Sequence, residues 1–404
     1  MSDEAASLPT GIQLTSLDPT YRTDAESIHA RMRSECPVHH DTQLGRYFLT
    51  SGKDIEAVLR NRSLLSDPDR ANPGTLVKLQ TERRGFVKSM LFLDDPDHGR
   101  LRSLVTKAFS QRSINEIALH IEQVASELLD AVEGKPSFDV IADYASPLPI
   151  IIIAEILGVD PADRAEFIAW SRTADNAFNP MLTEEQEEAR VRSQAELEEY
   201  FARQIAKRRE KPTGDLISAM IEAADGEHRL TDREIVITCN LLLVAGNVTT
   251  TDLIGNAVRL LIDHPDQRDA LLANSELAAN MVEEVLRFDP PVTASTRIAP
   301  EDMEIGDTAI PRGEVMFTAL QSVGRDPELN PDPGQFDIGR EKPVHQAFGG
   351  GVHFCLGAQL ARAEARIAIP LLFERFPGLS LVEHPERKIA PSFNGYAKLI
   401  VTTA

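Results

Sequence analysis

A run of glycines followed by one cysteine, Phe348-Gly-Gly-Gly-Val-His-Phe-Cys-Leu-Gly357, constrains this chain more than any other segment. Three consecutive glycines allow positive φ angles and let the backbone approach a flat ligand closely. The letters after Gly357, Ala-Gln-Leu-Ala-Arg-Ala-Glu-Ala-Arg, are typical of a helix. Cys355 therefore stands where a loop turns into a helix, and we expect the free N–H groups and the helix dipole to favour its thiolate.

A single cysteine limits the kind of metal site that this loop can form. A structural zinc site needs four ligands, whereas Cys355 stands alone in its segment. A lone thiolate can still be the one protein ligand of a metal whose other positions are already filled, and haem iron is the obvious case. The alternative is a glycine-rich turn that ends in a buried structural cysteine.

The pattern Phe-Gly-x-Gly-x-His-x-Cys-x-Gly in this loop resembles the haem-binding signature of the cytochrome P-450 family. The resemblance extends from Tyr47 to about Leu399, through several elements at family-like spacings. It implies a mostly α-helical fold with small β regions. We expect one large domain that spans residues 1–404, in which residues 1–20 form a loosely ordered N-terminal arm.

The same resemblance implies a cofactor and its contacts. It predicts haem b, an iron protoporphyrin, with Cys355 as the axial ligand of the iron and with Phe348, Gly349 and His353 as further contacts. Dioxygen and external electrons would then be co-substrates.

Composition narrows the choice of partners. The chain has 404 residues and a net charge of −21, which argues against nucleic acid and against anionic membrane surfaces. Three scattered cysteines fit a reducing cytosol, no signal peptide is readable, and no apolar run approaches the ~20 residues of a membrane span. We therefore expect a cytoplasmic protein, monomeric and without a membrane partner. The segment Cys36-Pro-Val-His-His40 groups one cysteine and two histidines. It leads into a predicted strand, and a metal site there is the alternative.

Two basic residues follow the long, turn-rich segment 65–95. His98 and Arg102 are four residues apart, so they share one face of the helix that opens there. They form either a solvated basic face or, as the resemblance implies, a clamp on the haem propionates. Arg297, on a predicted strand, resembles the residue that reaches the second propionate; the alternative is a solvent-facing strand residue.

The longest helix is predicted from Thr231 to His264, where Pro265 stops it. Thr231-Asp-Arg-Glu234 has the spacing of a capping box, and 34 residues span on the order of 50 Å. Inside lies Ala-Gly-Asn-Val-Thr-Thr-Thr-Asp252, whose glycine and β-branched residues disfavour a helix where the core most needs one. Such conflicts are typical of functional sites, although an exposed bend explains the same letters.

This element resembles the Ala-Gly-x-acid-Thr motif that lines the oxygen pocket of the family. Matched residue by residue, Gly246 leaves room for dioxygen and Thr249 supplies the proton-relaying hydroxyl. The chain departs from the family at Val248, which stands where an acid is usual and cannot carry protons. Asp252 is the nearest carboxylate and Asn247 can hold a water, so the proton route stays open.

Further positions follow from the resemblance. Glu284 and Arg287 are close enough to pair, either as a surface bridge or as the family's buried structural pair. Residues 172–182 correspond to a mobile lid over the substrate, or to the joint of an ordinary helix pair. The expected substrate-lining residues are Leu241, Val244, Val248, Thr293 and Phe393.

The resemblance implies a monooxygenase that hydroxylates or epoxidises a hydrophobic small molecule. Electrons would come from NAD(P)H through a ferredoxin reductase and a ferredoxin, which a basic patch near the cysteine would bind (Arg100, Lys107, Arg112, Arg362 and Arg366). Because of Val248, a peroxygenase or an isomerase or dehydratase on the same scaffold is an alternative, and a non-catalytic haem or ligand carrier is a more distant one.

Overall fold

The computed structural model describes residues 8–82, 86–174, 181–224 and 230–403, and within these residues the fold is predominantly helical, as expected. The helices are α1 (Pro19–Glu35), α2 (Gly52–Arg60), α3 (Leu76–Thr81), α4 (Asp97–Thr106), α5 (Gln111–Asp130), α6 (Pro147–Leu157), α7 (Arg164–Ala174), α8 (Glu184–Glu210), α9 (Leu216–Ala224), α10 (Asp232–Asp263), α11 (Pro265–Ala273), α12 (Ala278–Phe288), α13 (Leu320–Gly324) and α14 (Ala358–Arg375).

The strands form small sheets. One sheet has the order β1-β2-β7-β4, in which β2 and β7 are parallel and the other pairs antiparallel; a second has the order β3-β9-β8, and β5 and β6 form a hairpin. The strands are β1 (Val38–Asp41), β2 (Arg46–Leu49), β3 (Ser137–Asp139), β4 (Ala294–Ile298), β5 (Met303–Ile305), β6 (Thr308–Ile310), β7 (Val315–Ala319), β8 (Ser380–Leu381) and β9 (Ile400–Thr402). The expectation of small β regions is confirmed.

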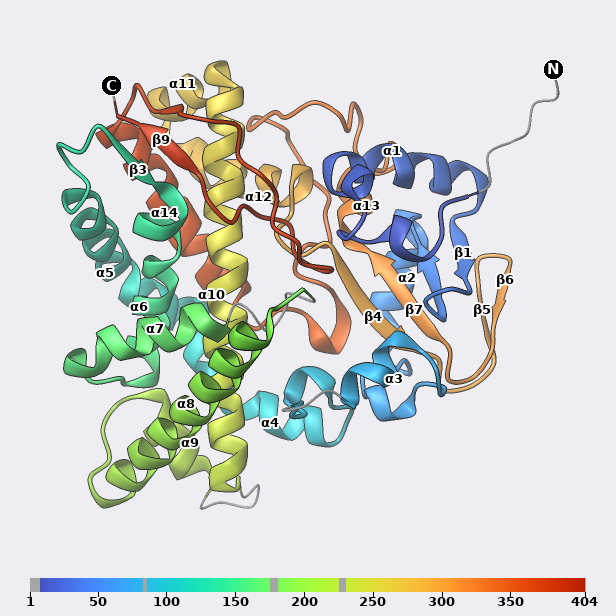
Figure 1. Cartoon of the computed structure of the whole chain (residues 1–404), viewed down its shortest axis with the longest axis horizontal. Helices are drawn as coiled ribbons and strands as arrows, with labels where there is room; N and C mark the ends of the chain where they lie inside the picture. The colour runs from blue at the N-terminus through green and yellow to red at the C-terminus, as the bar shows by residue number, and fades with distance from the viewer. Residues whose placement is uncertain (1–7, 83–85, 175–180, 225–229, 404) are drawn as a thin grey trace.

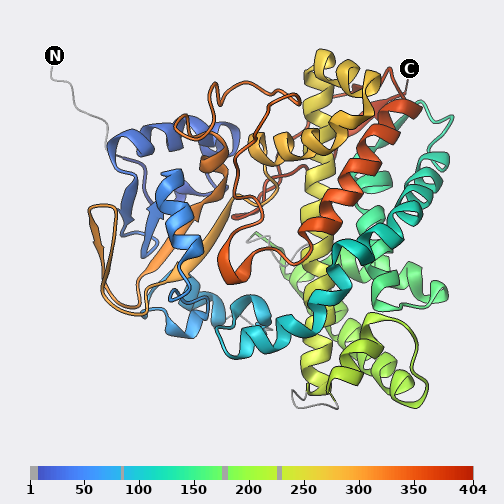
Figure 2. The ribbon, with the colours of Figure 1, turned by 180° about the vertical axis from the view of Figure 1, so that it is seen from behind.

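The long helix α10 runs through the middle of the molecule (Figure 1). Helices α5, α6, α7, α9 and α14 lie on one side of it, α8 crosses in front of it, and α1, α2 and the four-stranded sheet lie on the other side. The view from behind shows α14 between α10 and α5, with the loop before α14 facing α4 (Figure 2). The largest core cluster draws on residues from Met90 to Val401, so α10 is packed against apolar side chains over most of its length.

Helix α10 begins and ends where the sequence predicts. The backbone N–H of Thr231 donates to Glu234 Oε2 (2.8 Å) and the N–H of Glu234 donates to Thr231 Oγ1 (3.2 Å), so the capping box is formed. His264 is the C-cap residue before Pro265. Within the helix, the Thr249 hydroxyl donates to the Ala245 carbonyl (2.9 Å), which satisfies the side chain locally while the helix continues.

Some sequence expectations need correction. Of the expected loose arm, residues 1–7 lie outside the described part, but Gly11–Leu14 forms a 3-10 turn with Leu14 1% exposed, so this part is packed. The segment 65–95 is not all loop, because it contains α3. Residues 175–180, in the middle of the expected lid, lie outside the described residues.

Two helical stretches, Val140–Leu157 and Asp232–Asp263, are long and apolar enough to cross a membrane, which corrects the expectation that no apolar run approaches that length. In the fold, 78% and 50% of their most apolar windows are buried. Both stretches belong to the core cluster, which explains their hydropathy without a membrane.

A fully buried ion pair joins α12 to the irregular segment that follows α13. Arg287 Nε and Nη2 each donate to a Glu284 carboxylate oxygen at 2.7 Å, and neither side chain is exposed. The guanidinium also donates to the carbonyls of Gly324 (2.7 Å), Pro333 (2.9 Å) and Gln335 (2.7 Å). All its N–H directions are used, so this pair is structural and buried, not a surface bridge.

We predict that Arg287→Met destabilises the fold by about 3–5 kcal/mol, because it leaves a buried carboxylate without its main partner and three carbonyls without a donor. The matched control is Arg203→Met, which breaks an exposed pair with Glu199 on α8 and should cost less than about 1 kcal/mol. Urea unfolding of both variants measures the difference, and equal losses would contradict the structural role of the buried pair.

Candidate functional site

The glycine-rich loop is folded tightly against the end of α2. Gly349 and Gly351 both have φ near +66°, which favours glycine at these positions. A Cβ atom on Gly351 would lie 2.2 Å from the carbonyl oxygen of Leu59, so no larger residue fits there without a shift of backbone. The N–H of Cys355 donates to the carbonyl of Phe348 (2.9 Å) and closes the loop just before α14.

The Cys355 sulfur lies in a concave place that solvent reaches while protein surrounds it on most sides. This partial burial raises the pKa of the thiol, and the N–H of Gly357 and the charges of Arg102 and Arg362 oppose the rise only in part. The expectation that the helix terminus alone favours the thiolate is therefore wrong in its net direction. A cation bound to the sulfur would lower the pKa of the thiol and favour the thiolate.

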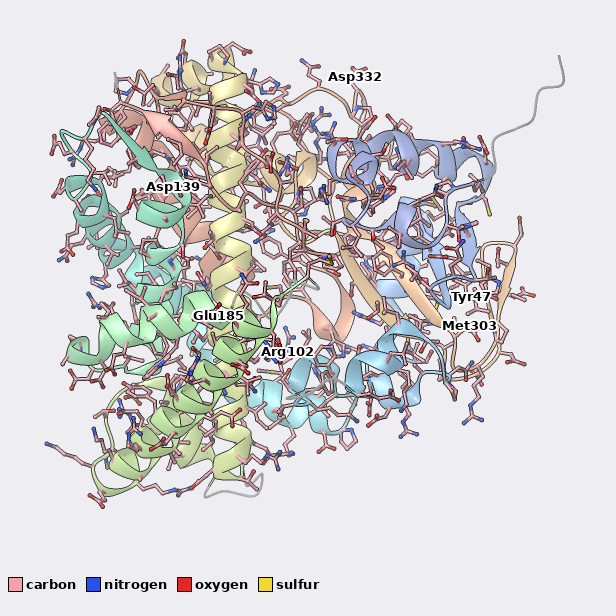
Figure 3. The ribbon with its side chains drawn as sticks, in the orientation of Figure 1. Tyr47, Arg102, Asp139, Glu185, Met303 and Asp332 are labelled. Atoms are coloured by element: carbon pink, nitrogen blue, oxygen red, sulfur yellow. The ribbon has the colours of Figure 1, made fainter. Side chains whose placement is uncertain are left out.

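Four basic side chains from three distant segments gather beside the loop: His98 and Arg102 on α4, Arg297 on β4, and His353 in the loop itself. Burial, together with the charges of His98, Arg297 and Arg102, lowers the pKa of His353 to about 3. The rings of His98 and His353 lie 4.0 Å apart. Figure 3 places Arg102 near the centre of the molecule, whereas Tyr47 and Met303 lie out in the β-rich part.

Hydrogen bonds hold this cluster to the backbone of the loop. The ring nitrogens of His98 lie 2.9 Å from the carbonyl oxygen of Met90 and 3.1 Å from that of Val352. Arg102 donates to the carbonyl of Phe354 (2.5 Å). Arg297 donates to the Thr296 carbonyl (2.7 Å), and its burial, which Asp94 only partly offsets, lowers its pKa. The cluster thus has an excess of positive charge in a protein that is acidic as a whole.

The residues singled out on α10 lie on different faces of the helix. Gly246 lies beside Ile153, where a Cβ atom would make only an ordinary contact at 4.0 Å. Asn247 is fully buried and accepts a hydrogen bond from Thr251 (3.2 Å), which also bonds to Ala145. The structure therefore does not bring Asn247 to the half-exposed face that carries Thr249.

Asp252 and Val248 are also buried. Val248 is 4% exposed, and Asp252 is 0% exposed and paired with Lys388 in the C-terminal loop at 2.6 Å. Asp252 lies three residues after Thr249 and therefore close to the same face.

The residues expected to line a substrate site fall into two groups. Leu241, Val244 and Val248 follow one face of α10 at spacings of three and four. Thr293 and Phe393 lie together, because the N–H of Thr293 bonds to the carbonyl of Ser392 (3.0 Å) and Val292 bridges to Phe393. The second group lines a polar groove of about 970 Å³ between α1, the end of α10 and the C-terminal loop.

Among the described residues, no group of three His, Cys, Asp or Glu side chains is arranged to hold a metal ion, and this includes the segment from Cys36 to His40. The geometry at Cys355 is of another kind. One sulfur ligand stands at a loop–helix junction, with a basic cluster on one side and a long helix across from it, as in haem-thiolate oxygenases.

The comparisons agree with this class. The chain belongs to the cytochrome P450 family of monooxygenases, which are oxidoreductases: the family model described as Cytochrome P450 matches residues 48–402. Cytochrome P450 107B1 of Saccharopolyspora erythraea is 39% identical over 383 residues, 92% of this chain and 93% of that protein. The 6-deoxyerythronolide B hydroxylase of the same organism is 36% identical over 374 residues, 90% of this chain and 91% of that protein.

Solved structures show the same fold. The crystal structure of ligand-free CYP164A2 from Mycobacterium smegmatis matches with a TM-score of 0.86 and 37% identity, over 96% of this chain and 98% of that one. The family implies a haem cofactor, dioxygen and external electrons.

The residues of this chain fit a haem. Haem carries two propionate carboxylates, and the four basic side chains can donate charge-assisted hydrogen bonds to them. A Cβ atom on Gly357 would meet nothing within 4 Å, so the first turn of α14 leaves space beside the sulfur. Cys355 and Ala245 are both exposed although they belong to the loop and the helix that meet at the core.

Sequence reasoning missed two residues of the site. Glu364 on α14 is buried, and burial raises its pKa to about 8 although the Thr250 hydroxyl hydrogen-bonds to it. The sequence did contain a signal for Glu364, because this acid stands among the apolar residues that α14 buries. Lys388 offered no such signal, because its partner Asp252 is 136 residues away in sequence.

We predict that Glu364→Gln removes a pH dependence of stability. With the folded pKa near 8 and the ordinary value at 4.5, the folded state binds more protons than the unfolded state between these values. Stability of the unaltered protein therefore falls as pH rises through this window, by up to about 1.4 kcal/mol per pH unit relative to the variant. Urea unfolding from pH 5 to 8 measures it. Glu199→Gln, at an exposed glutamate, is the control, and parallel curves for Glu364→Gln would show that Glu364 is ionised in the fold.

Proposed function

We propose that this protein is a haem b monooxygenase that inserts one oxygen atom of dioxygen into a hydrophobic small molecule, by hydroxylation or epoxidation. Its electrons come from NAD(P)H through a ferredoxin reductase and a ferredoxin, and it works as a cytoplasmic monomer of one domain. The observation that supports this most is the Cys355 sulfur beside the charge of Arg102, at the start of a helix, α14, that packs against α10. The hydroxylase activity named for a relative of 36% identity agrees with it.

Each part of the site has a role in this proposal. Cys355 would hold the haem through its sulfur, and a haem held by a thiolate would supply iron that activates dioxygen. His98, Arg102, Arg297 and His353 would hold its carboxylates and so orient the cofactor. Phe348 and Gly349 shape the loop around the sulfur, where the Arg362 guanidinium lies 4.4 Å from the centroid of the Phe348 ring.

The other side of the site belongs to α10. Gly246 leaves space beside the helix, and Thr249 presents a hydroxyl that can accept and pass on a proton. Leu241, Val244 and Val248 form an apolar face that favours a hydrophobic substrate and excludes water. Thr293 and Phe393 do not belong to this face, because they line the separate groove beside the C-terminal loop.

Val248 supports a second candidate, a peroxygenase. A valine at the position of the usual acid removes one proton donor, and a peroxide already carries the protons and electrons that dioxygen lacks. A comparison of product formed with ferredoxin and dioxygen against product formed with hydrogen peroxide alone distinguishes the two. An isomerase or dehydratase would need neither oxidant.

We predict that the reduced, haem-loaded protein with carbon monoxide shows the long-wavelength absorption that thiolate ligation produces, and that Cys355→Ala abolishes it. The control is Cys36→Ala, which removes a half-buried thiol from another segment and should leave the spectrum unchanged. Persistence of the absorption in Cys355→Ala would overturn the proposed function.

The surface around the cysteine loop is where we expect the electron donor to bind. Arg100, Arg112 and Arg362 of the expected basic patch are each paired with a glutamate (Glu234, Glu116 and Glu283). Lys107 and Arg366 are exposed, and within the described part of the chain no carboxylate lies at ion-pair distance from either. These two charges are therefore the part of the patch that is available to an acidic ferredoxin.

We predict that Lys107→Glu with Arg366→Glu slows reduction by ferredoxin about tenfold at low salt, with convergence toward the unaltered rate at high salt. Lys135→Glu with Lys211→Glu, at two exposed lysines, controls for the change of net charge. Stopped-flow reduction in a carbon monoxide atmosphere gives the rates. Unchanged rates at every salt concentration would exclude this surface as the docking site.

A further inference from the structure

A polar stripe runs along one face of α10, away from Thr249 toward the end of the helix. Thr249, Asp252, Asn256, Arg259 and Asp263 follow one another at spacings of three, four, three and four residues. Residues at these spacings are neighbours on one helical face. In a helix that is otherwise packed against apolar side chains, a polar stripe of this length requires an explanation.

Asp252 is the most deeply buried carboxylate of the stripe. It is 0% exposed, and Lys388 Nζ lies 2.8 Å from its Oδ1 and 2.6 Å from its Oδ2. Lys388 lies in the C-terminal loop, where its N–H bonds to the Gly395 carbonyl (3.0 Å). A Cβ atom on Gly395 would come 2.1 Å from Asp252 Oδ1, so only glycine lets the loop close over this carboxylate.

The other end of the stripe reaches solvent in the polar groove. The groove, of about 970 Å³, is lined by Arg259, Asp263 and Lys388 among others, and the Lys388 side chain is 24% exposed. Its lining includes neither Thr249 nor Cys355. The stripe and its lysine therefore connect two separate places, an open polar groove and the half-exposed Thr249.

The charges around Asp252 tune it for proton exchange. Burial raises its pKa to about 6, Lys388 and Arg387 of the C-terminal loop oppose the rise, and Asp289 after α12 adds to it. A group with a pKa near the working pH can both give and regain a proton. Asp252 follows Thr249 by three residues in α10, so the two side chains are neighbours on one face of the helix.

We propose that Asp252, recharged from the groove through Lys388, is the proton-relay residue for Thr249 and takes over the task of the acid that Val248 replaces. This inference rests on the proposed function, because the relay serves the activation of dioxygen. The alternative role of the same contacts is structural: together with Asp289, which bonds to Arg387 (2.7 Å) and Asn394 (2.6 Å), they anchor the C-terminal loop.

Proton supply can be measured without knowing the substrate. The substrate-free holoenzyme receives electrons from NADPH through spinach ferredoxin and its reductase. Dioxygen then leaves either as hydrogen peroxide, with two electrons and two protons, or as two waters, with four of each. The amounts of NADPH and dioxygen consumed and of peroxide released show what share of the dioxygen becomes peroxide and what share becomes water. Slow proton delivery raises the peroxide share.

For Asp252→Asn we expect the rate of water formation to fall by roughly tenfold or more, since a positioned donor contributes about 10²–10⁴-fold and bulk water replaces part of it. Adding Val248→Asp to this variant restores the water share, because it supplies an acid on the adjacent face. Lys388→Met resembles Asp252→Asn, whereas Lys388→Arg does not. In the unaltered protein the peroxide share rises with pH around the pKa of Asp252, and Asp252→Asn loses this dependence.

Asp289→Asn is the matched control, because it breaks the anchor of the C-terminal loop and leaves the Asp252–Lys388 pair in place. Because the Asp289 charge raises the pKa of Asp252, a relay predicts that Asp289→Asn shifts the rise of the peroxide share to lower pH and leaves the share at low pH equal to that of the unaltered protein. If Asp289→Asn raises the peroxide share at low pH as much as Asp252→Asn does, or if Val248→Asp restores nothing, the contacts are structural and the relay is overturned.

A second measurement does not depend on turnover. In pH-difference infrared spectra, the carboxyl band that Asp252→Asn removes should titrate near pH 6, and Lys388→Met should move its midpoint upward, because the lysine charge lowers the pKa. An unchanged titration midpoint in Lys388→Met would overturn the coupling between Asp252 and Lys388. If the unaltered protein shows the carbon monoxide spectrum and this titration but consumes no dioxygen, the proposed function fails and the Asp252–Lys388 coupling stands.

Discussion

The arrangement of this molecule depends on one guanidinium with no contact to water. Arg287 bonds to Glu284 on its own helix, to the carbonyl of Gly324 at the end of α13, and to the carbonyls of Pro333 and Gln335 in the irregular segment that follows. That segment has almost no regular secondary structure until α14, so side chains take over much of the bonding to its backbone. Arg287 contributes to this together with Asn280, Asn330 and Arg340, and the segment ends in the loop that carries Cys355.

The next constraint is electrostatic. The protein has a net charge of −21, yet His98, Arg102, Arg297 and His353 lie together with their charges only partly compensated. Buried like charges are unfavourable without an anion, as the low pKa of His353 shows. The site is thus formed at a cost in stability that a bound anion would offset. Burial likewise raises the pKa of Cys355, and a cation bound to its sulfur would favour the thiolate.

The local features of this fold could be predicted from the sequence, and the long-range ones could not. The capping box at Thr231, the end of α10 before Pro265 and the turns at Gly349 and Gly351 depend on neighbouring residues only. The direction of the Cys355 pKa shift was misjudged because burial, a property of the whole fold, outweighs the local helix terminus. The packing of Leu14 and the side of α10 that Asn247 occupies were decided by tertiary contacts in the same way.

The pairing of Asp252 with Lys388 shows most clearly why a motif does not replace a structure. The Val248 departure suggests a missing acid, but only the fold shows that a carboxylate one turn further on is buried and paired. A valine at 248 adds to the apolar face of α10, and an apolar face excludes water. In the proposed relay, protons come along the helix axis from the groove instead. One face of α10 can thus be apolar toward the substrate and polar toward solvent, since the two requirements are separated by a single turn.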